Sequence, residues 1–484
     1  MSETAAELRP ANFIAGEWVP SRGGDVYERH NPWRPTDVIG EFPSSTAEDA
    51  DAAIAAAQRA LPGWAGLAAA QRGAYLRKAA DVVEARVEEI AHDMTREMGK
   101  PLRESRIEAT RAAAILRFFS GEGWRPVGEL FEQSAAKSLV YTRRRPVGVV
   151  GLITPWNFPA AIPTWKMAPA LAYGNTVVLK LAQDSPLTGL HLVRALEEAE
   201  LPEGVLNLVI GSGSKVGEAI VTDPRVRAVS FTGSVPVGQG VRERATKLGK
   251  RVQLELGGHN PLIVAEDAQL DKAAEAAYAG AFWSAGQKCT ATRRIFVADP
   301  VYDEFRERFL QRIADGKVGD PADPETEVGP LVNESQFNDV MAGIARGQEE
   351  RGTLIAGGER TDPDAYLISP TVFEDVPDDG FLSCEEVFGP VTTLYRFSSV
   401  KEAIQRANAV AFGLSASVFT TNLAVAQQFV DELQAGILHV NSQTAGADVH
   451  VPFGGSKESG YGPHEQGRAA IEFYTEEITV YQDV

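Results

Sequence analysis

The chain has 484 residues with 44% hydrophobic content, which is enough to bury the cores of two or three domains. Its formal net charge of −19 argues against nucleic acid or an anionic membrane as a partner, because both would repel it. The two cysteines, Cys289 and Cys384, form neither a metal-binding pattern nor a disulfide scaffold, which favours a reducing cytoplasm. No apolar run approaches the ~20 residues of a membrane span, and residues 1–10 lack the apolar segment of a signal peptide.

The N-terminal part of the chain predicts short strands followed by helices. Turn signals divide the first forty residues into extended pieces. Thr46, with Asp49 three residues later, predicts a capped helix start. Apolar residues recur at helical spacing over 69–98, and a further helix is expected over 104–119. Packing is the role expected for these helices.

Residues 137–145 alternate as a strand, and apolar runs separated by helical stretches follow. Near-continuous apolar strands of this kind predict a parallel sheet covered by helices on both faces, in the doubly wound manner of dinucleotide-binding domains. The expected strands are 147–153, 176–179, 205–210 and 228–231, and the expected helices are 164–173, 186–199, 214–222 and 235–247.

A second α/β series occupies the C-terminal half, and an alternating strand ends the chain at residues 474–482. This last strand has no evident partner in the sequence, so we expect it to pair with the sheet edge of another subunit. The strands expected before it are 260–264, 292–297, 371–374, 391–395, 415–419 and 437–440.

Cys289 is the candidate nucleophile. Lys288 and two nearby arginines flank it, and cations favour the reactive thiolate. Cys384 precedes two glutamates, whose charges raise a thiol pKa, so we expect it to be inert. His259 and His450 are candidates to pair with Cys289 in hydrolase-type catalysis, although no local signature surrounds them.

Two polar residues have environments that suit catalysis. Glu255 lies in an apolar strand before two glycines, where burial raises a carboxyl pKa toward that of a general base; pairing with an arginine is the alternative. Asn157 lies in the turn 154–159 after a strand, where its amide could donate to an oxyanion or could simply form the turn.

Three segments follow strands at positions where a parallel sheet binds nucleotides. Gly213 belongs to Gly211–Gly217, whose GxGxxxG spacing departs from the GxGxxG of dinucleotide-binding loops. Gly233 and Ser234 open a helix whose N-terminus would bind a pyrophosphate. Lys180 ends an apolar strand and could bind ribose hydroxyls. Ordinary βα turns, and a solvated lysine at a strand end, are the alternatives.

Together these segments resemble the aldehyde dehydrogenase superfamily over roughly residues 10–480. The resemblance implies an α/β protein with a Rossmann-like doubly wound cofactor domain, an α/β catalytic domain and a small β oligomerisation element. The segments that carry it are 154–159, 178–180, 231–234, 254–258, 286–289, 386–390 and 452–457. The implied boundaries are 1–123 and 146–256 for the NAD(P)-binding domain, 257–455 for the catalytic domain, and 124–145 and 456–484 for the oligomerisation element.

The resemblance also implies a covalent mechanism. Cys289 would attack the aldehyde to give a thiohemiacetal, with Asn157 holding the oxyanion. Hydride would pass to the nicotinamide and leave a thioester, which water activated by Glu255 would hydrolyse to a carboxylic acid. The residues implied around the cofactor are Thr154, Trp156, Lys180, Gln183, Gly213, Phe231, Gly233, Ser234, Glu386 and Phe388.

The cofactor is expected to be NAD, with NADP as the alternative. NAD-preferring members of the superfamily often carry a glutamate that binds ribose three residues after the lysine, and here that position is Gln183. A neutral amide does not repel a 2′-phosphate as a carboxylate would.

The substrate is expected to be a small-molecule aldehyde. Trp165 and Trp283 stand where succinate-semialdehyde dehydrogenases usually place arginines, which removes those carboxylate clamps; with Phe453 they would line the substrate pocket. Three other segments resemble bacterial 2,5-dioxopentanoate (α-ketoglutarate semialdehyde) dehydrogenases, namely 283–292, 439–453 and 461–467. A broad-specificity or aromatic aldehyde dehydrogenase is the alternative.

Two other classes of function remain open from the sequence. A non-catalytic homologue would lose Cys289 or Glu255, and both are present. A non-redox cysteine hydrolase or acyltransferase would turn over esters without a nicotinamide cofactor. For the enzyme we expect a homodimer or homotetramer, with no metal, nucleic acid or membrane partner.

Overall fold

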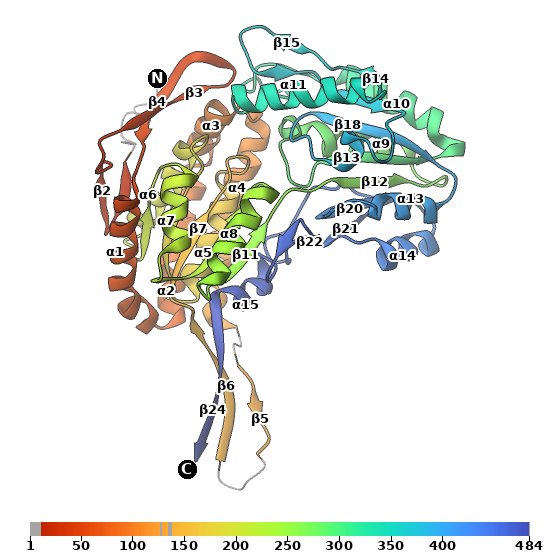
Figure 1. Cartoon of the computed structure of the whole chain (residues 1–484). Helices are drawn as coiled ribbons and strands as arrows, with labels where there is room; N and C mark the ends of the chain where they lie inside the picture. Colours follow the sequence, from red (N-terminus) through yellow and green to blue (C-terminus); the bar gives the residue numbers. More distant parts are fainter. Residues whose placement is uncertain (1–10, 126–127, 134–137, 484) are drawn as a thin grey trace.

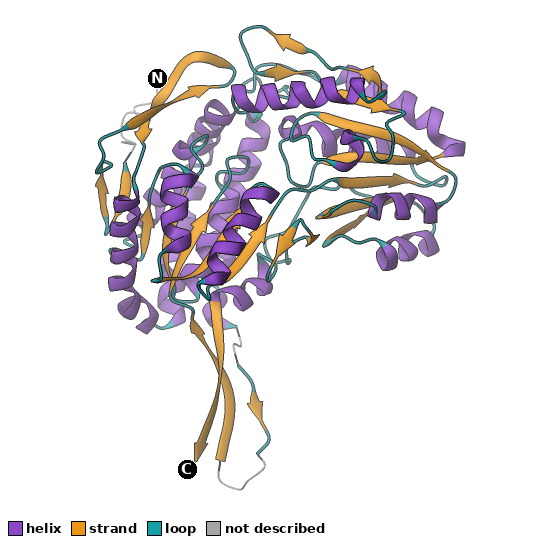
Figure 2. Cartoon of the chain, in the orientation of Figure 1, coloured by secondary structure: helices purple, strands orange, loops and turns teal. Residues whose placement is uncertain are grey.

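The computed structural model describes residues 11–125, 128–133 and 138–483. Two α/β bodies lie side by side, and a narrow projection of strands extends below the first body (Figures 1 and 2). Each body is built on a sheet in which most neighbouring strands are parallel, so the predicted α/β class is confirmed.

The first body contains an eight-stranded sheet in the order β2-β1-β9-β8-β7-β10-β11-β23. The chain builds outward from β7 through β8 to β9 and then returns to the other side of β7 for β10 and β11. This reversal creates a switch point between β7 and β10, the place where doubly wound sheets bind ligands. The strands are β1 (Asn12–Ile14), β2 (Glu17–Val19), β7 (Val149–Ile153), β8 (Thr176–Lys180), β9 (Leu206–Leu208), β10 (Val226–Thr232), β11 (Arg251–Glu255) and β23 (Gly460–Tyr461).

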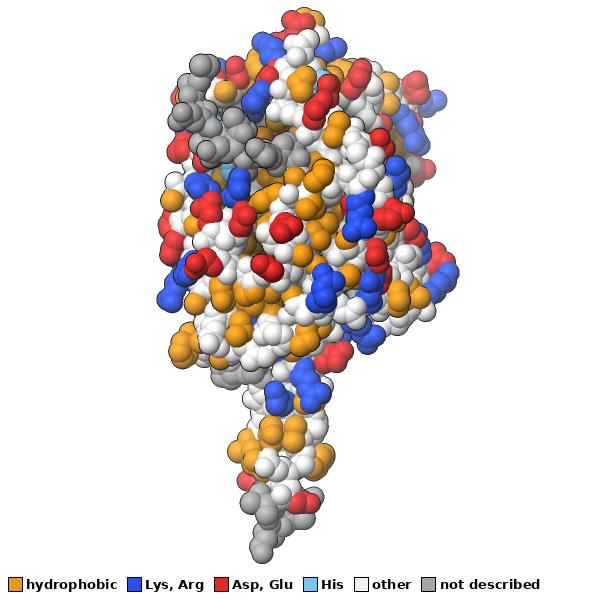
Figure 3. Space-filling model, turned by 90° about the vertical axis from the view of Figure 1, so that its left-hand side faces the viewer, with side chains coloured by type: hydrophobic (Ala, Val, Ile, Leu, Met, Phe, Trp, Pro, Cys, Tyr) orange, Lys and Arg blue, Asp and Glu red, His pale blue; other side chains and the backbone are white. Residues whose placement is uncertain are grey.

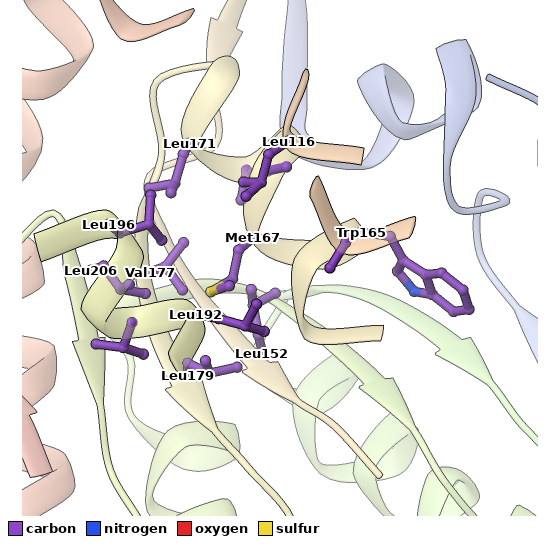
Figure 4. Packing of buried hydrophobic residues seen from close by; sticks show 14 of the residues in the cluster. Leu116, Leu152, Trp165, Met167, Leu171, Val177, Leu179, Leu192, Leu196 and Leu206 are labelled. Carbon is purple, nitrogen blue, oxygen red and sulfur yellow. The ribbon is translucent and has the colours of Figure 1, made fainter. Parts of the chain in front are cut away.

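Helices cover both faces of this sheet because successive strand residues point to opposite sides. Val149 and Ile153 pack with α1 (Ala47–Gly66), α7 (Glu218–Thr222) and α8 (Val235–Lys247). Val150 and Leu152 pack in the opposite core, part of which is drawn in Figure 4. The helices of that core are α2 (Ala69–Ala85), α3 (Val87–Met98), α4 (Leu102–Ser120), α5 (Ala161–Ala172) and α6 (Pro186–Glu198).

Two helical predictions differ from the structure. The helix expected over 69–98 is two helices, because Arg86 has φ −112° and ψ 17° and interrupts the helical path. The helix expected over 214–222 begins as a π-helical turn, Gly213–Gly217, before α7. The capped start at Thr46 is confirmed, since its backbone N–H donates to the Asp49 carboxylate at 2.9 Å.

The second body contains a seven-stranded sheet in the order β14-β17-β18-β13-β12-β20-β21, with its own hydrophobic core. Its strands are β12 (Asn260–Val264), β13 (Thr292–Ala298), β14 (Thr353–Ala356), β17 (Thr371–Glu374), β18 (Val391–Phe397), β20 (Ser415–Phe419) and β21 (Ile437–Val440). Its helices are α9 (Leu270–Phe282), α10 (Tyr302–Asp315), α11 (Glu334–Glu349), α12 (Phe381–Cys384), α13 (Val400–Asn408) and α14 (Leu423–Glu432). Small two-stranded sheets pair β3 (Val26–Asn31) with β4 (Arg34–Pro43), β15 (Arg360–Asp362) with β16 (Leu367–Ile368), and β19 (Phe412–Gly413) with β22 (Ser456–Lys457).

The projection is a three-stranded antiparallel sheet of β24 (Thr475–Asp483), β6 (Ser138–Pro146) and β5 (Leu130–Phe131). The expectation that the terminal strand lacks a partner in the chain is wrong, because β24 pairs with β6 along its whole length. β24 is nevertheless the outer strand of this sheet, so its other edge is unpaired among the described residues. The preceding short helix α15 (Ala470–Tyr474) packs against α5 of the first body.

Candidate active site

The predicted nucleotide-binding residues lie where neighbouring parallel strands of the first sheet end. The register pairs Ile153, the last residue of β7, with Lys180 and with Phe231. Thr232 in turn pairs with Glu255, the last residue of β11. The turns that follow these strands therefore open on one edge of the sheet, beside its switch point.

A cavity of about 420 Å³ lies at this edge and is lined by residues of both bodies. Residues from the ends of β7, β10 and β11 line one side of it, and residues of α11 and of the segment around Glu386 line the other. The predicted residues that line it are Trp156, Asn157, Gly233, Ser234, Glu386, Phe388 and Cys289. Five further predicted cofactor residues do not line it, namely Thr154, Lys180, Gln183, Gly213 and Phe231.

The groups that line this cavity, together with groups at the neighbouring strand ends, fit a nicotinamide dinucleotide. An added Cβ on Gly233 would lie 2.6 Å from the ring of Phe231, so the turn before α8 requires glycine. No side chain caps the N-terminus of α8, where first-turn N–H groups lack partners within the helix. Thr154 and Thr232 each carry a buried hydroxyl with no hydrogen-bond partner. Burial lowers the pKa of Lys180, at the end of β8, to about 8.

Glu386 is a half-buried carboxylate on the far wall of the cavity. It accepts a hydrogen bond from the backbone N–H of Gly258 at 3.1 Å, and a Cβ on Gly257 would lie only 2.2 Å from it. Burial raises its pKa to about 7. Phe388 meets Trp156 edge to face at 5.5 Å between ring centroids. A carboxylate and two aromatic rings thus frame one end of the cavity, as expected for ribose and nicotinamide contacts.

Cys289 is held by a loop with an unusual backbone. Ser284 and Ala285 have φ of 58° and 52°, and Gly286 has φ of 66°. Left-handed backbone is costly for residues with a Cβ and is retained only where surrounding contacts impose it. Here the Glu104 carboxylate accepts hydrogen bonds from the Ser284 N–H at 3.0 Å and from its hydroxyl at 2.5 Å. Glu104 therefore positions the loop that carries the thiol.

The cations that flank Cys289 in the sequence make their hydrogen bonds to the backbone. Burial, followed by the charges of Glu386 and Glu255, raises the pKa of its thiol to about 12. The ammonium group of Lys288 donates to the Ala279 carbonyl at 2.8 Å, and Arg293 donates to the carbonyls of Gly389 and Gly286, both at 2.6 Å. The hydrogen bonds of these cations therefore hold the backbone around the thiol.

Asn157 and Glu255 approach the thiol from the first body. The amide of Asn157 donates one hydrogen bond to the Gln287 carbonyl at 3.0 Å, two residues before Cys289. Glu255 forms no ion pair with any described residue, so the alternative of pairing with an arginine is wrong. Burial raises its pKa well above the usual value, and the nearby Glu465 carboxylate, itself paired with Lys166, adds to the shift.

A second cavity, of about 300 Å³, opens on the other side of Cys289. The predicted substrate residues Trp165, Trp283 and Phe453 all line it, and the rings of Trp165 and Phe453 lie 5.4 Å apart. α4 also contributes to the cavity, which was not predicted from the sequence. The lining residues are Glu104, Ile107, Glu108 and Arg111 of α4 and Lys100 of the preceding loop. The helical spacing of these polar residues was the available signal.

The other reactive candidates lie away from both cavities. His259 is buried with neither ring nitrogen hydrogen bonded to a described residue, and His450 is exposed. Neither lines a cavity with Cys289. Cys384 donates to the Asp378 carbonyl at 3.4 Å, and burial raises its pKa. In the part of the chain that the structure describes, no cluster of three or more His, Cys, Asp or Glu residues could hold a metal ion.

Comparison with known proteins decides the family. Residues 18–480 match the model of the aldehyde dehydrogenase family. The chain belongs to this family. Like its relatives, it is an NAD(P)-dependent oxidoreductase that acts on a small-molecule aldehyde. Within residues 11–125, 128–133 and 138–483, no helix is long and apolar enough to cross a membrane.

The similar proteins include enzymes with assigned substrates and cofactors. The alpha-ketoglutaric semialdehyde dehydrogenase of Bacillus subtilis is 45% identical, with 97% of each chain covered. The 2,5-dioxopentanoate dehydrogenase of Saccharolobus solfataricus is 40% identical, covering 97% of this chain and 98% of that one. The crystal structure of Staphylococcus aureus betaine aldehyde dehydrogenase in complex with NAD+ has a TM-score of 0.96 at 33% identity, covering 99% of this chain and 96% of that chain. An NADP-dependent enzyme from E. coli also has a TM-score of 0.96, at 37% identity and 99% coverage of both chains.

Proposed function

We propose that this aldehyde dehydrogenase oxidises 2,5-dioxopentanoate to 2-oxoglutarate and prefers NAD. The main support for this proposal is that Cys289 lines both cavities. One cavity has the contacts of a nicotinamide dinucleotide, and the other has room for a short-chain aldehyde. The substrate assignment is supported by two relatives that cover nearly the whole chain, one named for α-ketoglutaric semialdehyde and one for 2,5-dioxopentanoate.

Each catalytic residue has a role that its surroundings support. Cys289 loses its S–H proton to solvent and bonds to the aldehyde carbon through sulfur, which opens the C=O double bond to an oxyanion. The second N–H of the Asn157 amide and the Cys289 backbone N–H stabilise this oxyanion. A nicotinamide held beside Glu386 and Phe388 would supply the hydride acceptor, and loss of hydride from this carbon would leave a thioester on Cys289. Glu255 then removes a proton from water, which attacks the thioester and releases the acid and the thiol. The raised pKa of Glu255 brings it toward the range in which a base works near neutral pH.

Contacts with the cofactor are assigned on the same basis. Ser234 and the N–H groups at the start of α8 bind the pyrophosphate. Glu386 binds the nicotinamide ribose, and Lys180 binds the adenosine ribose, because each is a charged group near the strand ends. Gln183 is half-buried and lies two residues before Ser185, the N-cap of α6. Its amide is neutral, so it does not repel the 2′-phosphate that distinguishes NADP from NAD.

We assign the enzyme to the cytoplasm and to a homodimer or homotetramer. Support for assembly comes from the projecting sheet, where Leu130 is 72% exposed and Tyr481 is 77% exposed. Figure 3 shows hydrophobic side chains along this projection. Exposed apolar side chains beside the free edge of β24 are typical of a subunit interface.

The aromatic lining of the substrate cavity favours one alternative. Trp165, Trp283 and Phe453 would also suit a broad-specificity or aromatic aldehyde dehydrogenase. The two functions are separated by measuring reduced cofactor at 340 nm with 2,5-dioxopentanoate, pentanal and benzaldehyde, first with NAD and then with NADP. We expect the highest kcat/KM for 2,5-dioxopentanoate with NAD; a higher value for benzaldehyde or pentanal would contradict the proposed substrate.

A further inference from the structure

The substrate cavity contains a cation that the other residues of the site do not neutralise. Arg111 of α4 lines the same cavity as Cys289. Its guanidinium donates one side-chain hydrogen bond, from Nη2 to Oε1 of Gln466 at 3.1 Å. Its Nε is buried without a hydrogen-bond partner, and it forms no ion pair with any described residue. An arginine in such a position retains free N–H donors in a fixed planar arrangement.

The other charged groups of this cavity are already satisfied. Lys100 is paired with Glu108, which also accepts the N–H groups of Ala160 and Ala161 at 2.8 and 3.0 Å. Glu104 holds the Ser284 loop, and Lys288 donates to a backbone carbonyl. Among the described cations of the cavity wall, Arg111 and Lys288 form no ion pair, and of these two only Arg111 has a buried N–H without a hydrogen-bond partner. Burial lowers its pKa, as expected for a cation removed from water, although Glu108 and Asp448 oppose this from beyond ion-pair distance.

Gln466 and Trp165 contact the Arg111 guanidinium and hold it in one orientation in the cavity. Gln466, which accepts its hydrogen bond, has φ of 60°, a left-handed conformation that a non-glycine residue adopts only when held there. The guanidinium also lies 5.9 Å from the ring centroid of Trp165. Figure 4 shows this ring apart from the aliphatic side chains around Met167, pointing away from them. Trp165 and Trp283 each carry an indole N–H with no acceptor among the described residues.

We propose that Arg111 is a specificity-determining residue that binds the carboxylate at the end of the substrate remote from the aldehyde. A planar guanidinium can donate two parallel hydrogen bonds to a carboxylate, or to a carboxylate oxygen and the neighbouring keto oxygen of a 2-oxo acid. The proposal rests on the proposed function, in which the substrate is an anionic semialdehyde. It also changes the interpretation of Trp165 and Trp283: they replace two expected arginines, but α4 supplies a cation to the same cavity.

The test compares an anionic aldehyde with an uncharged aldehyde of the same chain length. Steady-state kcat/KM is measured with saturating NAD for 2,5-dioxopentanoate and for pentanal, in the wild type and in Arg111→Gln, Arg111→Lys and Gln466→Ala. Arg106→Gln is the matched control, because Arg106 lies on the same helix but is exposed and paired with Glu88. Pentanal oxidation and the KM for NAD report whether each variant is folded and competent.

We expect Arg111→Gln to lower kcat/KM for 2,5-dioxopentanoate by about 10- to 100-fold, the range for a lost hydrogen bond to a charged group. The loss should appear mainly in KM, because the carboxylate does not change during the reaction. Arg111→Lys should recover part of the loss, since it restores the charge without the planar fork. Gln466→Ala should give a smaller loss in the same direction. Pentanal oxidation should stay within about threefold in every variant, and Arg106→Gln should match the wild type.

The outcomes separate this inference from the proposed function. A wild type that prefers 2,5-dioxopentanoate, together with an Arg111→Gln variant that keeps this preference within about twofold, overturns the role of Arg111 and leaves the substrate assignment standing. A wild type that oxidises pentanal as well as 2,5-dioxopentanoate overturns the substrate assignment and the inference with it. An equal loss for both aldehydes in Arg111→Gln and Arg111→Lys would show that Arg111 supports the fold, and this also contradicts the proposal.

Discussion

The two cavities that meet at Cys289 are built in different ways. The cofactor side uses turns that directly follow parallel strands, so its functional residues come in short, local segments such as Gly233 and Ser234. The substrate side is assembled from α4, α5, the loop after α9 and the segment 443–453, which are far apart in the chain. A strand end has one fixed place in a doubly wound sheet, whereas a helix face acquires its surroundings only through packing.

The substrate side also differs in its electrostatics. On the cofactor side, Glu386 accepts a backbone N–H and has the Arg293 guanidinium nearby. On the substrate side, Arg111 has no carboxylate within ion-pair distance. A site that binds a charged ligand tolerates an unpaired charge because the ligand completes the pair. The contrast leads to predictions that separate the two sides.

Apart from the loss of Cys289 itself, the largest effect is expected at Glu255, the general base. Glu255→Gln should lower kcat by about 10²- to 10³-fold, because the thioester loses its general base. A rapid burst of NADH, of about one equivalent per active site, should remain, since hydride transfer precedes hydrolysis. Stopped-flow absorbance at 340 nm measures both phases. Glu243→Gln, at a fully exposed glutamate of α8, is the matched control.

Loss of the burst together with the steady state would place Glu255 before hydride transfer and contradict the assignment. The pH dependence supplies a second check. A base acts only when deprotonated, and the pKa of Glu255 is raised, so the rise of kcat with pH should lie well above the usual carboxyl range. This rise should be absent from the pH profile of Glu255→Gln.

A smaller effect is expected on the cofactor side, at Gln183. Gln183→Glu should lower kcat/KM for NADP by about tenfold, corresponding to about 1.4 kcal/mol, because a carboxylate repels the 2′-phosphate. The value for NAD should stay within about threefold. Gln183→Met, which removes the amide without adding charge, is the control. Equal losses with NAD and NADP would place Gln183 away from the adenosine ribose.

The sequence predicted the cofactor side more fully than the substrate side, for physical reasons. Burial of Glu255 and its raised pKa could be predicted, because an apolar strand followed by glycines indicates the surroundings of its own carboxylate. The environment of Cys289 could not be derived from its neighbours in sequence, because adjacent residues need not point toward a thiol, and Lys288 and Arg293 donate to backbone carbonyls. Arg111 was missed because periodicity identifies a helix face but not the body that packs opposite it.

The terminal strand illustrates the same limit. Its alternation predicted a strand, and β24 is one, but the partner strand β6 lies more than three hundred residues earlier in the chain. Strand pairing over such a separation depends on how the bodies are arranged, which local pattern does not contain. The division into cofactor, catalytic and oligomerisation regions remains a prediction. β23, within residues 456–484, pairs with β11 of the first sheet.

Cys289 is proposed to form a covalent bond with an aldehyde at the place where the two cavities meet. The most direct measurement uses Cys289→Ala and records NADH formation from 2,5-dioxopentanoate together with the Kd for NAD by protein fluorescence. We predict that turnover falls by at least about 10⁴-fold, as for removal of a catalytic nucleophile, and that the Kd for NAD stays within about threefold of the wild type. Aldehyde oxidation that persists in Cys289→Ala would contradict this prediction.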